Sequence, residues 1–150
     1  LNSKRDWGHA KDYVYMQWLM LQQDTPEDYV IATGRMESVR NFVEICAKEL
    51  SWCAEHSEKS IIWKGNGINE VGIRADNDQI VIRVDPKYFR PTEVDQLLGD
   101  YKKAQEKLGW TPKTNLEEIA REMIAFDKEE AKRDALLKEK GFKTNKYEMN

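Results

Sequence analysis

The six residues Tyr29-Val30-Ile31-Ala32-Thr33-Gly34 form a short, nearly continuous apolar run that a glycine ends. Such a run is typical of a strand that is buried on both faces of a parallel sheet. A single buried strand needs hydrogen-bonded neighbours, because its backbone N–H and C=O groups must be paired. We therefore expect other strands of a parallel sheet beside this segment.

Helical patterns lie on both sides of this run. Residues 9–23 contain neither Gly nor Pro and predict a helix, but its apolar side chains, from Tyr13 to Leu21, spread around nearly the whole circumference. Such a helix needs protein against several of its sides. After the run, Ser38 is a typical N-cap for a second helix, which is predicted as amphipathic through Cys53.

A small sheet is predicted in the middle of the chain. Residues 61–63 predict a short strand, and residues 71–74 pair with residues 79–84 as a hairpin around the turn-forming Asp76-Asn77-Asp78. Pro86 and Pro91 argue against regular ladders between residues 85 and 99.

Two further helices are predicted in the last third of the chain. Asp100 and Gly109 are typical of the start and the end of a short helix, and Trp110 can fold back onto its last turn. A capping box, either Thr114 with Glu117 or Asn115 with Glu118, begins a long final helix.

Composition argues against two classes of partner. Lys and Arg number 24 against 27 Asp and Glu, which gives a net charge of −3, so no basic surface for nucleic acid is indicated. The longest apolar stretch, 18–21, is far shorter than the roughly 20 residues of a membrane span. We expect a soluble cytoplasmic protein, and its start at Leu1, without Met or a capping signal, suggests a piece of a longer one.

Motifs of a self-contained enzyme are missing. Gly65-Asn66-Gly67 has Glu70 where the third glycine of a dinucleotide fingerprint belongs, and no Tyr is followed four positions later by Lys. The two histidines, His9 and His56, are too few and too far apart to indicate a metal site. The sequence therefore offers no catalytic, cofactor-binding or metal residue.

Two arginines in stiff surroundings remain as candidates for anion binding. Arg5 lies just before the first helix, where its guanidinium could bind phosphate; a surface ion pair with Asp6 or Asp12 is the alternative. Arg90 is restrained by the proline that follows it, so it could meet phosphate while Glu93 accepts hydrogen bonds from a ribose or a base. A plain Arg90–Glu93 salt bridge is the competing interpretation.

The same two segments resemble a known family. The strings Arg5-Asp6-Trp7-Gly8-His9-Ala10-Lys11-Asp12-Tyr13-Val14 and Arg90-Pro91-Thr92-Glu93-Val94-Asp95 are similar to GDP-mannose 4,6-dehydratases. Further similarity follows in order along the chain, at residues 26–34, 38–40, 107–112 and 121–123. Residues 51–59 depart from the pattern, since this connection looks longer than the usual one between helix and strand.

The resemblance implies an activity. Enzymes of this family are expected to oxidise C4 of GDP-mannose with NADP, to eliminate water across C5 and C6, and to return the hydride to C6. The product, GDP-4-keto-6-deoxy-mannose, feeds GDP-fucose and other deoxyhexose pathways. By resemblance, Arg5 binds phosphate, and Arg90 and Glu93 hold the GDP moiety. The alternatives are another nucleotide-sugar dehydratase or epimerase, or a non-catalytic binding or scaffolding module.

The resemblance also implies an organisation. It implies an α/β fold in which residues 1–150 correspond to the C-terminal, sugar-nucleotide-binding portion of an extended short-chain dehydrogenase. This portion has helices, a small sheet and one strand that belongs to the parallel sheet of the parent protein. The N-terminal Rossmann portion, which binds NADP and carries the catalytic residues, lies outside this chain. We therefore expect the isolated chain to be inactive and the full-length enzyme to be a homodimer or homotetramer.

Overall fold

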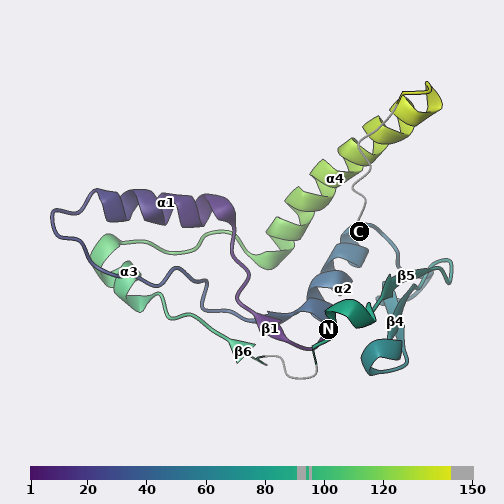
Figure 1. Cartoon of the computed structure of the whole chain (residues 1–150), viewed down its shortest axis with the longest axis horizontal. Helices are drawn as coiled ribbons and strands as arrows, with labels where there is room; N and C mark the ends of the chain where they lie inside the picture. Colours follow the sequence, from purple (N-terminus) through teal and green to yellow (C-terminus); the bar gives the residue numbers. More distant parts are fainter. Residues whose placement is uncertain (91–93, 95, 143–150) are drawn as a thin grey trace.

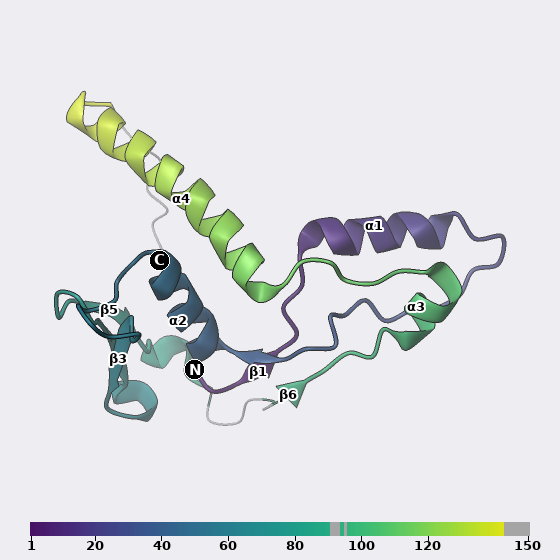
Figure 2. The same cartoon turned by 180° about the vertical axis from the view of Figure 1, so that it is seen from behind.

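The computed structural model describes residues 1–90, 94 and 96–142, and it confirms the mixed α/β fold expected from the sequence. Within these residues, a small central sheet lies between two groups of elements (Figure 1). Helices α1 (Ala10–Leu21) and α3 (Lys102–Leu108) lie on one side of it. Helix α2 (Val39–Glu49) and a second sheet lie on the other, as the reverse view confirms (Figure 2).

The central sheet is built from three two-residue strands far apart in the sequence. Strand β1 (Lys4–Arg5) pairs antiparallel with β2 (Glu37–Ser38) and parallel with β6 (Gln96–Leu97). Strand β6 corrects the expectation that residues 85–99 form no ladder. The short helix η2 (Pro86–Tyr88) uses Pro86 at its start, where the missing N–H removes no ladder hydrogen bond, and β6 begins only after both prolines in the sequence.

The predicted strand at residues 29–34 does not form. No strand lies beside this segment in the described part of the chain, so no ladder hydrogen bonds can hold it. Instead, the N–H groups of Thr33 and Gly34 donate to the carboxylate of Asp6. Ala32 and Thr33 are buried, whereas Val30 is 51% exposed, so only part of the run is covered.

The hydrophobic core lies between α1 and α3. Met16, Ala104 and Trp110 are almost fully buried there. Gly109 adopts the left-handed conformation with φ of 65°, which ends α3 and lets Trp110 fold back as the sequence predicted. The Trp110 Nε1–H donates to the backbone oxygen of Asp12 at 3.0 Å, so the buried ring has a polar partner in α1.

Helix α1 confirms the prediction of a helix with apolar residues on several sides. It is N-capped by His9, whose Nδ1 accepts a hydrogen bond from the N–H of Lys11. The side of α1 that does not face the core carries Val14, Trp18 and Leu21, which are all more than half exposed. These three side chains have no covering element in the described part of the chain.

The second half of the fold also follows the predicted pattern, with one shift. Ser38 caps α2 as predicted, but the helix ends at Glu49, before the expected end at Cys53, where Ser51 takes a left-handed conformation. Strand β3 (Ile61–Lys64) pairs with β4 (Val71–Arg74), which forms the predicted hairpin with β5 (Ile80–Arg83). The short helix η1 (Gly67–Asn69) joins β3 to β4.

Helix α4 (Leu116–Glu139) begins with the second of the two capping boxes that the sequence offered. The side chain of Asn115 accepts from the N–H of Glu118 at 2.8 Å, and the side chain of Glu118 accepts from the N–H of Asn115 at 2.9 Å. The first part of α4 packs against α2, and the rest extends away from the other elements (Figure 1).

Asp12 makes the attachment between α1 and the start of α4 dependent on pH. Burial raises the pKa of its carboxyl, but the hydrogen bonds from the backbone N–H groups of Thr114 and Lys113 hold the pKa below its ordinary value of 3.8. The resulting stabilisation is complete above that value and is lost as the pH falls through the lower pKa of the folded protein.

We therefore expect the Asp12→Asn variant to lose less stability than the unaltered chain when the pH is lowered. The free energy of unfolding, measured by urea denaturation between about pH 6 and about pH 2, should fall less steeply below about pH 4 for the variant than for the unaltered chain. Parallel curves for the two proteins would contradict the assignment.

Candidate functional site

The first candidate residue, Arg5, lies in β1 at the middle of the central sheet. Its Nη1 donates to the backbone oxygens of Lys4 at 2.8 Å and Val94 at 2.9 Å. Val94 follows the second candidate arginine, Arg90, by four positions. The fold therefore brings Arg5 against the segment that carries Arg90, although 89 residues of sequence separate Arg5 from Val94.

Arg90 lies on the surface, just after η2. The side chain of Asp85 caps η2 by accepting from the N–H of Lys87 at 2.9 Å, so the approach to Arg90 is ordered. Pro91 and Glu93 lie outside the described residues. The role of Glu93, and its salt bridge with Arg90 as the alternative, stay predictions.

Asp6 accepts hydrogen bonds from the segment around Thr33 and Gly34. The sequence indicated it only as a possible ion-pair partner of Arg5. Oδ1 of Asp6 accepts from the N–H of Thr33 at 2.8 Å and from the Thr33 hydroxyl at 2.6 Å. Its Oδ2 accepts from the N–H of Thr33 at 3.0 Å and of Gly34 at 2.9 Å. Asp6 thus binds the bend at Gly34 to the end of β1.

Trp7 and Gly8 extend these contacts toward α1 and α2. The Trp7 Nε1–H donates to the backbone oxygen of Glu37 at 3.1 Å, and its ring stacks on Phe42 with centroids 4.8 Å apart. A Cβ added at Gly8 would lie 2.0 Å from the hydroxyl oxygen of Tyr13, so the glycine allows that ring to approach. Residues 5–8 therefore form a junction of several distant segments.

Arg40 belongs to a segment that carries the family resemblance, and it has a structural role in this fold. Its Nη2 lies 2.8 Å from a carboxylate oxygen of Glu70 and 3.0 Å from Oδ1 of Asn2. The guanidinium also lies over the ring of Trp63, 4.6 Å from its centroid. These partners are distant in sequence, so spacing gave no signal for them.

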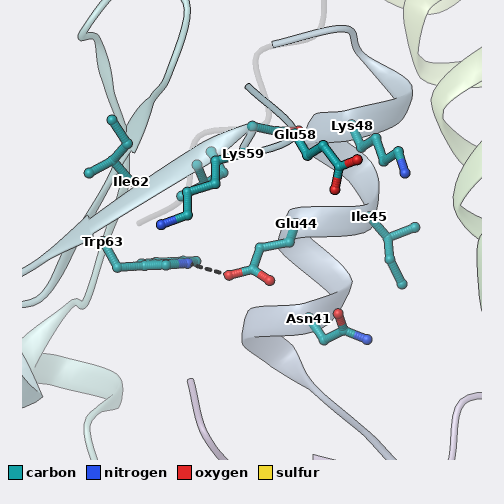
Figure 3. Close-up of a pocket in the computed structure, with 10 residues that line it drawn as sticks. Asn41, Glu44, Ile45, Lys48, Glu58, Lys59, Ile62 and Trp63 are labelled. Carbon is teal, nitrogen blue, oxygen red and sulfur yellow. Dashed lines mark hydrogen bonds between the residues drawn. The ribbon is translucent and has the colours of Figure 1, made fainter. Parts of the chain in front are cut away.

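One cavity lies between two elements that carry none of the predicted site residues. It occupies about 780 Å³ between α2 and β3, and Figure 3 shows charged side chains of both signs around it. The Trp63 Nε1–H donates to Glu44 at 2.7 Å across the cavity. Because two lysines and two glutamates line it, the cavity has no net charge that would favour a diphosphate. Its lining comprises Asn41, Glu44, Ile45, Lys48, Glu58, Lys59, Ser60, Ile61, Ile62 and Trp63.

A smaller cavity of about 110 Å³ lies beside the residues that Asp6 and Trp7 hold. Trp7, Thr33, Arg35 and Glu37 line it together with the residues around the start of α4. Within the described residues, no three or more His, Cys, Asp or Glu side chains gather as metal ligands. No helix in that part of the chain is long and apolar enough to cross a membrane.

Fold and candidate site together define an α/β protein that holds an arginine in a small central sheet, next to a second arginine-bearing segment. A family model described as GDP-mannose 4,6 dehydratase matches residues 1–123. The chain belongs to this family, which confirms the resemblance found in its sequence.

Individual relatives agree with the family match. The GDP-mannose 4,6-dehydratase of Yersinia enterocolitica is 53% identical over 152 residues, which cover 95% of this chain and 39% of that protein. The human GDP-mannose 4,6 dehydratase is 52% identical over 129 residues, 86% of this chain and 33% of its own length. The Drosophila melanogaster protein of that name is 50% identical, over 85% of this chain and 30% of its length. The chain thus spans well under half the length of these relatives.

Proposed function

We propose that this chain is the C-terminal, sugar-nucleotide-binding portion of a GDP-mannose 4,6-dehydratase. The complete enzyme converts GDP-mannose to GDP-4-keto-6-deoxy-mannose and water by an internal redox reaction that uses NADP. The observation that carries the proposal is the family match over residues 1–123. The relatives named GDP-mannose 4,6-dehydratase support it at 50–53% identity.

In this proposal, Arg5 and Arg90 bind the diphosphate, and Glu93 accepts hydrogen bonds from the nucleoside. A guanidinium presents N–H donors in a planar fork that matches the oxygens of a phosphate, which is the chemistry proposed for both arginines. The contact of Arg5 with Val94 supports a shared site, because it brings the two arginine-bearing segments together.

The described residues do not fit NADP. Gly65 and Gly67 lead into the three-residue helix η1, and a Cβ at Gly65 would lie 2.4 Å from the backbone oxygen of Asn69. This is a tight turn between two strands and not the glycine loop before a long helix that binds a pyrophosphate. We assign NADP binding and the catalytic residues to an N-terminal Rossmann portion outside this chain. We therefore expect residues 1–150 to be inactive by themselves.

Arg5→Ala and Arg90→Ala should each raise the KM for GDP-mannose in the complete enzyme by about 10-fold to 100-fold. Charge-assisted hydrogen bonds to a phosphate contribute roughly 1.5–3 kcal/mol each. Steady-state kinetics with varied GDP-mannose measure this effect. The matched control is Arg133→Ala, because Arg133 is exposed on α4 and pairs there with Glu130. An unchanged KM in both test variants would remove these two assignments.

Two rival functions lead to different outcomes. If the complete enzyme is another nucleotide-sugar dehydratase or epimerase, a substrate screen will show turnover of a different sugar nucleotide in place of GDP-mannose. If the chain is a scaffolding module, the 150 residues alone will bind a partner protein and ignore GDP in calorimetry. We further propose that the complete enzyme is a cytoplasmic homodimer or homotetramer, which sedimentation analysis would test.

A further inference from the structure

We propose that Asp6 is a positioning residue, which holds Arg5 in place for the diphosphate. This inference rests on the proposed function. It assigns no contact between Asp6 and the substrate: the carboxylate acts through Arg5, its neighbour in sequence.

Both oxygens of the Asp6 carboxylate accept hydrogen bonds from the bend at Gly34. The donors are Thr33 and Gly34, at distances between 2.6 and 3.0 Å. Thr33 is 8% exposed, so its three bonds to Asp6 are partly shielded from competing water, whereas the bond from Gly34 is exposed. The Thr33 hydroxyl also accepts from the N–H of Arg35 at 3.2 Å, which stabilises the bend itself.

Arg5 depends on this contact because the strand that carries it is short. Strand β1 contains two residues, paired with two-residue strands on either side. Such a strand has few ladder bonds to fix its direction. Asp6 immediately follows Arg5 and ties the end of β1 to the bend, while the Arg5 guanidinium itself bonds to Val94 on the other side. Together these bonds restrict where the guanidinium can lie.

An amide cannot replace this carboxylate. Asparagine has the size of aspartate, but one oxygen becomes an NH2 group, which donates and does not accept. The Thr33 N–H donates to both carboxylate oxygens, so in either orientation of the amide in Asp6→Asn it would keep one acceptor and face the NH2 group as a competing donor. We expect the bend to move away from the end of β1 and the Arg5 guanidinium to lose its defined position.

The test is the KM for GDP-mannose of the complete enzyme that contains this sequence. For Asp6→Asn we expect KM to rise about tenfold and kcat to stay within about twofold of the unaltered enzyme. The diphosphate is bound in both the ground state and the transition state, so weaker binding destabilises both equally and leaves kcat unchanged. Asp6→Glu keeps two acceptor oxygens and should restore part of the affinity. Thr33→Val removes the hydroxyl that donates to Asp6 and accepts from the Arg35 N–H, and it should raise KM by about threefold.

Asp12→Asn is the matched control for a purely structural effect. Asp12 is also a carboxylate that accepts from two backbone N–H groups of a distant segment, at Lys113 and Thr114. We expect Asp12→Asn to lower the thermal midpoint comparably without raising KM. Equal KM changes for the two Asn variants, or no change in Asp6→Asn, would overturn the inference.

Epistasis with Arg5 separates this inference from the proposed function. When Arg5→Ala is already present, adding Asp6→Asn should raise KM by less than about a further twofold, because the arginine that Asp6 positions is absent. A full tenfold additional rise would show that Asp6 acts by another route. If Arg5→Ala raises KM and Asp6→Asn does not, only the inference fails. If Arg5→Ala leaves KM unchanged, the proposed role of Arg5 fails, and the positioning role fails with it.

Discussion

Replacing Trp110 with alanine is expected to lower the free energy of unfolding of this chain by about 3–5 kcal/mol. Trp110 is 1% exposed and is the largest fully buried side chain in the described residues, packed against Met16 and Ala104. Its loss leaves a cavity between α1 and α3 and removes the hydrogen bond from Nε1 to the backbone oxygen of Asp12. Both effects act on the same core.

Urea denaturation followed by circular dichroism measures this loss. Trp18→Ala is the control, because Trp18 is 53% exposed on the outer side of α1 and stacks only on Tyr15. We expect it to cost less than about 1 kcal/mol. If both tryptophans gave the same loss, the core would not lie between α1 and α3, or α1 would be covered on its outer side in solution.

Gly99→Ala is expected to destabilise the chain by about 2–3 kcal/mol, because the new methyl group has no space. A Cβ at Gly99 would lie 2.2 Å from the Cβ of Ala32 and 3.2 Å from Cγ1 of Val30. The Ala32 Cβ is attached directly to the backbone, so no rotation of a side chain relieves the collision. The segments around residues 32 and 99 must separate, which disturbs the apolar run that leads to the bend at Gly34.

Two companion variants test the steric reason. Gly109→Ala meets no atom within 4 Å and has only the cost of a left-handed φ of 65°, about 1 kcal/mol. Ala32→Gly combined with Gly99→Ala exchanges the methyl group between the segments and should recover most of the loss, apart from the added flexibility of the new glycine. A double variant as unstable as Gly99→Ala alone would refute the close approach of these segments.

The elements predicted from local patterns were confirmed. Helix α1, the Ser38 cap, the hairpin of β4 and β5, and the capping box of Asn115 with Glu118 all depend on residues less than about 12 positions apart. The final turn before Trp110 belongs to the same group, since Gly109 is the residue that tolerates a left-handed conformation.

Two departures from the predicted pattern concern contacts that are not local. The run at residues 29–34 has the composition of a buried strand, but a strand forms only where a neighbour can pair with it, and the described residues place none there. The neighbours expected for this run belong to the N-terminal portion that we propose outside this chain. Strand β6 was missed for the opposite reason, because its two residues pair with β1, more than 90 positions earlier.

In the candidate site, too, residues with a local signal were predicted and contacts between distant residues were not. Arg5 and Arg90 were predicted to bind phosphate because each guanidinium lies in stiff surroundings, within a string of residues that resembles the family. The role of Asp6 was not found, since its hydrogen-bond partners lie 27 and 28 positions away. No spacing rule connects an aspartate to a bend at that distance.

The amino-acid sequence alone determined the family and the approximate positions of the helices, and it singled out the arginines that we propose for a diphosphate. Those properties depend on residue type and on short-range periodicity, which the chain carries wherever it is placed. Tertiary structure decided which segments meet: Arg5 with Val94, Asp6 with the bend at Gly34, and Trp110 with α1. These contacts arise only when distant parts of the chain pack together, because hydrogen bonds and van der Waals contacts act over a few ångströms.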